Sequence, residues 1–476
     1  MEYSKLSVRG FLREVQRGNV DLGDFYGKMF ARLRGLQREY NLFVTLSEKE
    51  AFEQLRSLPR GRLQGLPVSV KDNICTEGIQ STAGSRILEG YKPPFDAFAV
   101  EKTKRAGAVV VGKTQMDEFG FGTFSIHSGF GVPKNPIDPA RSCGGSSGGA
   151  AGLVKALDLP HVALAESTGG SISCPASFCG VTGLTPTYGL VSRWGLIDYA
   201  NSLDKIGVIA KGVDDCGLML EQIQGFDSRD FTSLKTLKKT YSRLGDISRL
   251  RIGVPREYFK GIDDGIKKEV WRAIHFLESQ GASWKKVSLP HTSYALAAYY
   301  IIASAEASTN LAKYCGMRYG QSLPLEGSIN QYFSRVRTRF LGQEAKRRIL
   351  LGTFARMAGY RKKMYEKAFQ VRSLVIQDFE QVFRGRGAVD VLAAPTMPIL
   401  PPKFKEIEKL SPLKQYQMDW LTVPANLVGI PQLSVPFGSH KGLPVGIHLL
   451  ADHLQEKKLL AAGKLLEKGA QPVEMG

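Results

Sequence analysis

Residues Ser142–Gly180 read SCGGSSGGAAGLVKALDLPHVALAESTGGSISCPASFCG and contain two serines enclosed by glycine. Ser146 lies within Gly-Gly-Ser-Ser-Gly-Gly, and Ser171 follows Thr-Gly-Gly. Glycine beside a polar side chain lets the backbone approach a ligand closely or adopt a positive φ. An apolar segment joins the two sites, so we expect two loops that meet at one pocket. From this pattern alone, either serine is a candidate nucleophile.

Short apolar runs alternate with helical patterns on both sides of this stretch. Such alternation is typical of an α/β protein built on a central sheet. We therefore expect a single domain over residues 1–476, with its core at about 60–255 and 385–450 and a helical elaboration at about 260–385. The predicted strands are 66–70, 108–111, 162–165, 250–254, 389–393, 432–435 and 445–450. The predicted helices are 5–17, 22–38, 47–57, 99–106, 116–119, 150–156, 171–178 and 456–468, and residues 183–205 are predicted to form a loop.

The chain is basic, with 64 lysines and arginines against 45 acidic residues and a net charge of +19. This balance favours a polyanionic partner and does not determine a fold. Basic residues concentrate at Arg335–Arg348 (RVRTRFLGQEAKRR) and Arg356–Lys367 (RMAGYRKKMYEK). Such runs are typical of a solvated helical face. RNA bound nearby is the alternative interpretation.

Several classes of protein are disfavoured by composition. The longest nearly apolar run, Ala295–Ala305, is too short to span a bilayer. The N-terminus lacks a basic-then-apolar secretory pattern, so we expect a cytoplasmic protein with no membrane partner. The six cysteines lack a zinc-type double CxxC motif, which predicts buried thiols rather than a disulfide framework, and no metal site.

The segment Gly107–Thr114 matches the P-loop pattern GxxxxGK[ST]. A P-loop requires a flexible loop whose N–H groups surround a phosphate. The four intervening residues here are Ala-Val-Val-Val, which favour a strand. We therefore expect no nucleotide site at this position.

The segment Gly144–Gly148 matches GxSxG, the pattern of the nucleophile elbow in α/β-hydrolases. Asp419 and His448 follow in the required order. None of the seven histidines lies in a glycine-rich or aspartate-paired loop, and His448 falls within an apolar run. A packed histidine is the better interpretation, and the hydrolase triad is disfavoured.

Lys71 is the remaining candidate base. It follows the apolar run Leu66–Val70 and precedes Asp72-Asn73, so a buried strand delivers an amine at its end. Burial in an apolar, hydrogen-bonded pocket favours the neutral form of a lysine, which can accept a proton. Neutral Lys71 would take the proton of Ser146, and Ser146 that of Ser171, which attacks an amide carbonyl. A surface lysine at a strand end is the alternative.

The order and spacing of strand-Lys71-Asp-Asn, GGSSGG and TGGSI resemble the amidase signature family. The resemblance implies an α/β fold in which helices cover both faces of a central mixed sheet. It also implies a triad of Lys71 as the base, Ser146 as a serine preceded by a cis peptide bond, and Ser171 as the nucleophile. Ser147 matches an accessory hydrogen-bonding position. The backbone N–H groups of Thr168, Gly169, Gly170 and Ser171 would form an oxyanion hole.

The resemblance covers nearly the whole chain and is strongest to one branch of that family, the glutaminase subunits of tRNA-dependent amidotransferases. It rests on the segments Pro186–Gly207, Glu306–Gly320, Lys346–Ala355 and Met418–Pro436. In that branch an arginine and an aspartate hold the free amino acid, and the matching positions here are Arg348 and Asp419. An arginine fork suits a carboxylate, and an aspartate can meet an ammonium group.

The resemblance further implies a glutamine amidohydrolase that works in a heterotrimer with a B and a C partner. The B partner would activate a misacylated tRNA with ATP and Mg²⁺ and receive ammonia through a tunnel, and the small C partner would lie between the other two proteins. This chain itself would need no cofactor. The tRNA would be Glu-tRNA(Gln), Asp-tRNA(Asn) or both. The alternatives are a stand-alone amidase of the same family and a catalytically silent RNA-binding or scaffold protein.

The sequence departs from the usual family pattern D-T-G-G-S-I-R around the nucleophile. Ser167 and Ser173 replace the aspartate and the arginine. Loss of both members of a buried ion pair leaves no unpaired charge. We therefore expect the two serines to face each other as neutral hydroxyls with activity retained, and Glu166 is a candidate replacement for the acidic group.

Overall fold

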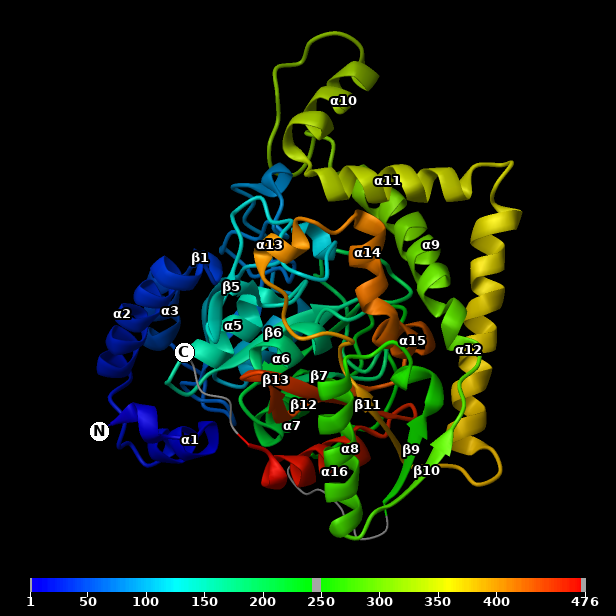
Figure 1. Ribbon diagram of the computed structural model, residues 1–476. Coiled ribbons are helices and arrows are strands. Elements are labelled where there is room, and N and C mark those ends of the chain that lie inside the picture. Colours follow the sequence, from blue (N-terminus) through cyan, green and yellow to red (C-terminus); the bar gives the residue numbers. More distant parts are fainter. Residues whose placement is uncertain (1, 242–249, 472–476) are drawn as a thin grey trace.

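The strands of the structure assemble into one large mixed sheet that runs through the centre of the molecule (Figure 1). The computed structural model describes residues 2–241 and 250–471. Within them the order of the large sheet is β1-β3-β2-β6-β8-β7-β12-β13-β11-β9-β10. The strands are β1 Phe43–Leu46, β2 Pro67–Lys71, β3 Val109–Thr114, β6 Val162–Ser167, β7 Thr182–Thr185, β8 Lys205–Ala210, β9 Arg251–Pro255, β10 Ser283–Val287, β11 Val391–Pro395, β12 Gln432–His440 and β13 Leu443–Ala451, and the short pair β4 Lys134–Asn135 and β5 Asp138–Ser142 lies apart.

The sheet is parallel toward its two ends and antiparallel in the middle. β2 pairs in parallel with β3 and β6, and β9 pairs in parallel with β10 and β11. Strands β6 to β13 are antiparallel to their neighbours across the centre. Strands β2, β3, β6, β8 and β11 are buried along their whole length, which explains why their sequences are nearly continuous apolar runs.

Helices cover both faces of this sheet. Alternate residues of β12 show the two sides: Leu433 and Val435 lie against Gly463 of α16, whereas Ser434 is near Gly446, which contacts Ser177 of α6. The helices are α1 Val8–Gln16, α2 Leu22–Tyr40, α3 Glu48–Arg56, α4 Phe98–Arg105, α5 Gly148–Ala156, α6 Ser173–Cys179, α7 Val213–Ile223, α8 Asp264–Ser279, α9 Thr292–Asn310, α10 Ile329–Phe340, α11 Gln343–Arg356, α12 Lys367–Arg384, α13 Phe404–Ile407, α14 Pro412–Tyr416, α15 Val423–Val428 and α16 Glu456–Gly469.

The predicted fold class, an α/β protein with helices on both faces of a mixed sheet, is confirmed. Four strands were not foreseen, namely β1, β7, β8 and β10. The predicted loop at 183–205 begins inside β7 and ends at the first residue of β8. β10 lies in the segment predicted to be helical, and its sequence Ser-Trp-Lys-Lys-Val is that of a lysine-rich, largely exposed edge strand. Polar edge strands carry no apolar run, and this is why the pattern missed it.

Residues between β10 and β11 form a helical layer on one side of the molecule. Helix α9 packs against both α11 and α12, and α10 projects away from the body (Figure 1). None of the described helices is long and apolar enough to cross a membrane. All six cysteines are free thiols, and five of them are buried.

The crossing of α11 over α9 depends on Gly352. A Cβ at this position would overlap the backbone carbonyl of Ser304 on α9. Glycine in a helix normally costs about 1 kcal/mol relative to alanine. Its presence here is explained by the close approach of the two helices.

Gly352→Ala should therefore lower the free energy of unfolding by about 1–3 kcal/mol, the usual cost of an overpacked contact. Urea unfolding of the purified chain would measure it. Gly35→Ala is the matched control, because Gly35 also lies in a helix and a Cβ there would meet nothing within 4 Å. That variant should be stabilised by about 1 kcal/mol or less. Equal stabilisation of both variants would contradict the close-packing explanation.

Candidate active site

Lys71 ends β2 at the edge of the sheet where the serine loops converge. Its side chain has no exposed surface, and its Nζ lies 2.7 Å from Ser146 Oγ. The same nitrogen lies 3.0 Å from the backbone oxygen of Glu166 and 2.9 Å from Glu166 Oε2. Strand β6, which carries Glu166, is the direct neighbour of β2 in the sheet. The structure therefore brings the candidate base and the first candidate serine into contact.

The first serine loop has the backbone that its glycines permit. Gly144 has a φ of 78°, and the Gly145–Ser146 peptide bond is cis. A Cβ on Gly145 would overlap Asp117 Oδ2 and lie 2.7 Å from the backbone nitrogen of Ser125. Only glycine fits between these groups, which explains the residue that precedes Ser146.

The two serine loops meet directly, as the glycine pattern leads one to expect. The backbone N–H of Ser147 donates to the backbone oxygen of Ser171 across 3.2 Å. The Ser147 hydroxyl donates to the backbone oxygen of Glu166 across 3.1 Å. Ser147 therefore joins both loops to the end of β6.

Ser171 lies two residues before α6, with its side chain at the wall of a small cavity. The cavity is lined by Gly120, Gly122, Gly170, Ser171, Tyr199, Tyr299, Tyr300, Arg348 and Asp419. Among the described residues, the backbone N–H groups of residues 168–171 donate no hydrogen bond. They are available to a negatively charged oxygen beside Ser171. Ser171, Arg348 and Asp419 share this one cavity, although α11 and the Asp419 turn lie far from the serines in sequence.

Arg348 enters the cavity from α11 as a buried cation. Its Nε lies 2.6 Å from Glu344 Oε1, its Nη1 lies 3.1 Å from the Tyr199 hydroxyl, and Tyr416 covers its guanidinium face at 4.3 Å. The nearby side chains of Tyr199, Tyr300 and Glu344 raise the pKa of Arg348 despite its burial. Among the described residues Nη2 has no hydrogen-bond partner, so it is available to a ligand carboxylate.

Asp419 supplies the opposite charge in the same cavity. Its two oxygens accept from the Thr123 hydroxyl at 2.9 Å and from the Tyr300 hydroxyl at 2.6 Å. Burial raises the pKa of Asp419 to about 6, and the hydrogen bonds from Tyr300 and Thr123 partly offset this effect. The carboxylate is therefore ionised at neutral pH and suited to an ammonium group.

The expected pairing of Ser167 with Ser173 is wrong. The Ser167 hydroxyl donates to the backbone oxygen of Gly169, and the Ser173 hydroxyl donates to Gln432 Oε1. Two amides lie between them, because Asn426 donates to the backbone oxygen of Ser167 and accepts from Gln432. Neutral hydrogen bonds from β12 and α15 thus occupy the space, and the serines have no need of each other.

Three side chains of the site were not foreseen as such. Tyr300 and Thr123 hold Asp419, and Tyr199 contacts Arg348. Tyr199 lies in one of the segments that carry the family resemblance, whereas no residue pattern marks Thr123. Their roles depend on contacts between segments distant in the chain.

The hydrolase-type triad on Ser146 is excluded by the geometry. His448 lies in β13 with its Nε2 2.9 Å from Gln432 Oε1, and burial lowers the pKa of His448 to about 3. Asp419 instead contacts Thr123 and Tyr300. His448 is a packed histidine, as its apolar surroundings predict.

The P-loop-like residues also form no loop. Val109–Thr114 is strand β3, and Lys113 is buried with its Nζ 2.6 Å from the Ile74 backbone oxygen and from the Ser81 hydroxyl. The prediction of a strand at this position is confirmed. Within residues 2–241 and 250–471, no group of three or more histidine, cysteine, aspartate or glutamate side chains is arranged to hold a metal.

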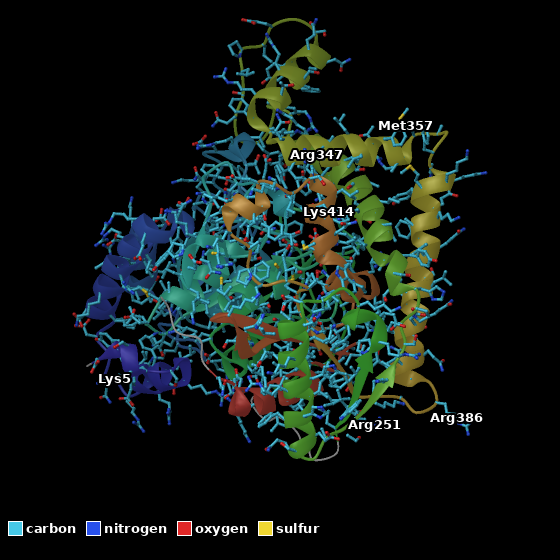
Figure 2. The ribbon with its side chains drawn as sticks, viewed as in Figure 1. Lys5, Arg251, Arg347, Met357, Arg386 and Lys414 are labelled. Atoms are coloured by element: carbon cyan, nitrogen blue, oxygen red, sulfur yellow. The ribbon has the colours of Figure 1, made fainter. Side chains whose placement is uncertain are left out.

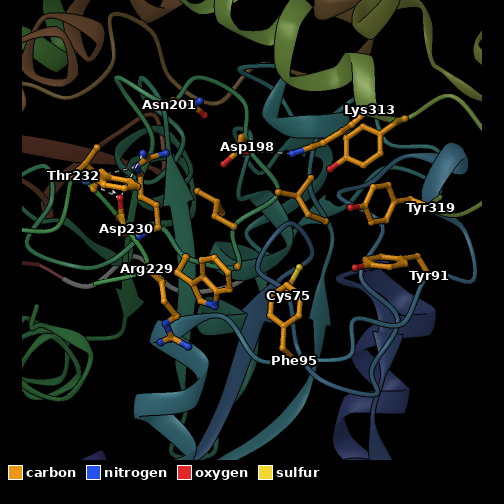
Figure 3. A pocket seen from close by; sticks show the side chains of 17 residues that line it. Cys75, Tyr91, Phe95, Asp198, Asn201, Arg229, Asp230, Thr232, Lys313 and Tyr319 are labelled. Atoms are coloured by element: carbon orange, nitrogen blue, oxygen red, sulfur yellow. Dashed lines mark hydrogen bonds and ion pairs between the residues drawn. The ribbon is translucent and has the colours of Figure 1, made fainter. Parts of the chain in front are cut away.

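A more open pocket of about 410 Å³ lies close to the cavity but does not contain either candidate serine (Figure 3). Tyr91 and Tyr319 form one wall, and Asp198 pairs with Lys313 at its rim at 3.2 Å. Asp198 directly precedes Tyr199, which lines the serine cavity. The two hollows are therefore separated by a short stretch of backbone.

The basic segments on α10, α11 and the start of α12 are divided between surface and interior. Arg347 lies on the outer side of α11, with its side chain 40% exposed, whereas the side chain of Arg348 is 3% exposed (Figure 2). Most of this charge therefore forms a solvated helical face, and one residue of it is turned into the cavity.

The family profile described as Amidase matches residues 26–460. This chain belongs to the amidase family. The chain is 51% identical over 413 residues to the glutamyl-tRNA(Gln) amidotransferase A protein of Methanococcoides burtonii, with 86% of this chain and 85% of the relative covered. The protein of the same name from Archaeoglobus fulgidus is 47% identical over 445 residues, with 93% and 94% covered.

A solved structure agrees with this membership. The corresponding glutamyl-tRNA(Gln) amidotransferase protein of Thermotoga maritima superposes with a TM-score of 0.83 at 34% identity, covering 100% of this chain and 99% of the other. Membership of the amidase family confirms the resemblance drawn from the Lys71, Ser146 and Ser171 motifs. The relatives extend it to the amidotransferase branch of that family.

Proposed function

We propose that this chain is the glutamine-hydrolysing component of a glutamyl-tRNA(Gln) amidotransferase. The observation that carries the proposal is the cavity in which Ser171 shares walls with a buried cation, Arg348, and a buried anion, Asp419. A free amino acid with an amide side chain presents a carboxylate, an ammonium group and a carbonyl. The cavity offers a partner for each, and the names of the relatives agree.

The reaction begins when Ser171 Oγ attacks the side-chain carbonyl of glutamine. The proton of Ser171 passes to Ser146 Oγ, and the proton of Ser146 passes to the lone pair of Lys71 Nζ, 2.7 Å away. The backbone N–H groups of residues 168–171 stabilise the oxyanion, each worth about 3 kcal/mol. Collapse breaks the carbon–nitrogen bond, and the proton returns through the relay to the nitrogen, which leaves as ammonia. Water then hydrolyses the acyl-enzyme to glutamate.

Two buried charges select the free amino acid. Arg348 Nη2 takes the α-carboxylate, and Asp419 takes the α-ammonium group. Tyr300 joins the two, because its hydroxyl donates to Asp419 and its ring lies 4.6 Å from the Arg348 guanidinium. A simple amide without these charges would leave both residues buried without partners, which disfavours a general amidase.

The ammonia acts on a misacylated tRNA held elsewhere in a heterotrimeric complex with the B and C partners. We assign ATP, Mg²⁺ and the activation of the tRNA-linked carboxylate to the B partner, because Val109–Thr114 forms a strand where this chain has its P-loop-like sequence. Glu-tRNA(Gln) is the proposed substrate of the complex, with Asp-tRNA(Asn) as a second one. The work of the complex in translation accords with a cytoplasmic location.

Ser171→Ala in the assembled complex should lower glutamine hydrolysis by roughly 10³-fold or more, since loss of a catalytic nucleophile has effects of this size. Release of glutamate and ammonia would be measured with tRNA and ATP present. Ser177→Ala is the matched control, because this buried serine lies in the same region on α6 and faces β13 instead of the cavity. It should stay within about threefold of the wild type.

An active complex that tolerates Ser171→Ala would overturn the assignment of the nucleophile. A wild-type complex without glutaminase activity would favour the silent scaffold protein. An isolated chain that hydrolyses simple amides as fast as glutamine would favour the stand-alone amidase.

The KM for glutamine should rise as the pH falls below about 6, by up to roughly tenfold per pH unit. The cause is protonation of Asp419, which removes the partner of the ammonium group. Asp419→Asn should show a high KM that does not change with pH in this range. Tyr300→Phe removes a hydrogen bond that lowers the pKa of Asp419, so the rise should begin at a higher pH. A KM that is independent of pH in the wild type would contradict the role of Asp419.

A further inference from the structure

A second buried carboxylate stands behind the candidate base. Glu166 is 1% exposed, and each of its carboxylate oxygens accepts hydrogen bonds. Oε2 lies 2.9 Å from Lys71 Nζ and 3.0 Å from Asn73 Nδ2, and Oε1 lies 2.9 Å from the Thr168 hydroxyl. Glu166 thus contacts the base without lining the cavity in which Ser171 lies.

Counting hydrogens on Lys71 shows what this contact does. Its Nζ has three neighbours within 3.0 Å: Ser146 Oγ, the Glu166 backbone oxygen and Glu166 Oε2. A neutral amine has two hydrogens and one lone pair. Both oxygens of Glu166 are acceptors only, so they take the two hydrogens. The lone pair then points at Ser146 Oγ, which is the direction that the relay requires.

We propose that Glu166 is a positioning residue of the glutaminase, which orients Lys71 toward Ser146 and stabilises the ammonium that forms when Lys71 accepts the proton. The inference rests on the proposed relay of Lys71, Ser146 and Ser171. As in a serine–histidine–aspartate triad, a carboxylate fixes the base and balances its charge without itself taking the proton.

The group beyond Glu166 keeps it ionised. The Thr168 hydroxyl lies between Glu166 Oε1, at 2.9 Å, and Asp204 Oδ1, at 2.7 Å. A hydroxyl has one hydrogen and donates to only one of two carboxyl groups, so the other must carry a proton. Burial and the charge of Glu166 raise the pKa of Asp204 well above its ordinary value. The proton therefore belongs to Asp204, which donates to Thr168, which donates to Glu166.

The other charged groups near this set come from three directions. Asp117 faces Lys71 from the turn after β3, and Arg193 and Asp198 face Asp204 from the segment before β8. Burial raises the pKa of Asp117, and Arg193 and Asp198 act on Asp204 with opposite sign. Glu166 is the only one of these carboxyl groups in contact with Lys71 among the described residues.

The test is Glu166→Gln in the assembled complex, with kcat and KM for glutamine measured across pH. The amide lacks the charge, so kcat should fall by roughly 10²–10⁴-fold while KM stays within about threefold. The acidic limb of the pH profile of kcat/KM should move to lower pH, because the ammonium form of Lys71 loses its anionic partner. Glu456→Gln is the matched control, a buried glutamate that accepts from Thr187, and its pH profile should equal that of the wild type.

An unchanged acidic limb together with an unchanged kcat would overturn the proposal. Should Glu166→Gln fail to fold, as judged by thermal unfolding, Glu166→Asp replaces it. That carboxylate is one methylene shorter, so kcat should fall with the acidic limb in place, and a wild-type kcat would overturn the proposal. Failure of the relay itself is separate, because Ser171→Ala would then retain activity in an otherwise wild-type complex.

Discussion

The amine of Lys71, buried without any exposed surface, is the constraint on which the rest of the site depends. A buried amine must have acceptors on every side. Pairing of β2 with β6 sets Val70 opposite Leu164, and this register brings Lys71 beside the end of β6, where Glu166 lies. The glycine loop that carries Ser146 then closes the remaining side. The position of one cation thus requires a strand register, a tight loop and a carboxylate together.

The substrate cavity solves a second problem of buried charge. Glu344 and the surrounding tyrosines balance Arg348, whereas Asp419 has only neutral donors. Its raised pKa shows the cost of that burial. A zwitterionic ligand would bring an ammonium group to Asp419 and a carboxylate to Arg348, so the charges of the cavity are complete only when it is filled. Selectivity for a free amino acid follows from this incomplete balance.

The extent to which the sequence predicts the structure differs between local and distant features. The apolar run before Lys71 and the valines before Lys113 predict β2 and β3, because buried strands are recognisable from their own residues. Arg347 and Arg348 are adjacent and chemically identical, yet only one is buried. Local pattern cannot separate them, and the family resemblance did. The Ser167–Ser173 pairing failed because Asn426, 259 residues from Ser167, enters between them.

The order of the strands has a consequence for how the chain matures on the ribosome. β7, in the middle of the sheet, pairs with β12, so residues 182–185 must wait for residues 432–434. Asn426, which binds the backbone of Ser167 beside the nucleophile loop, arrives equally late. A nascent chain that already contains Lys71, Ser146 and Ser171 still lacks the strands that join the two ends of its sheet. Hydrolytic competence is therefore withheld until synthesis is nearly finished, and an incomplete chain consumes no glutamine.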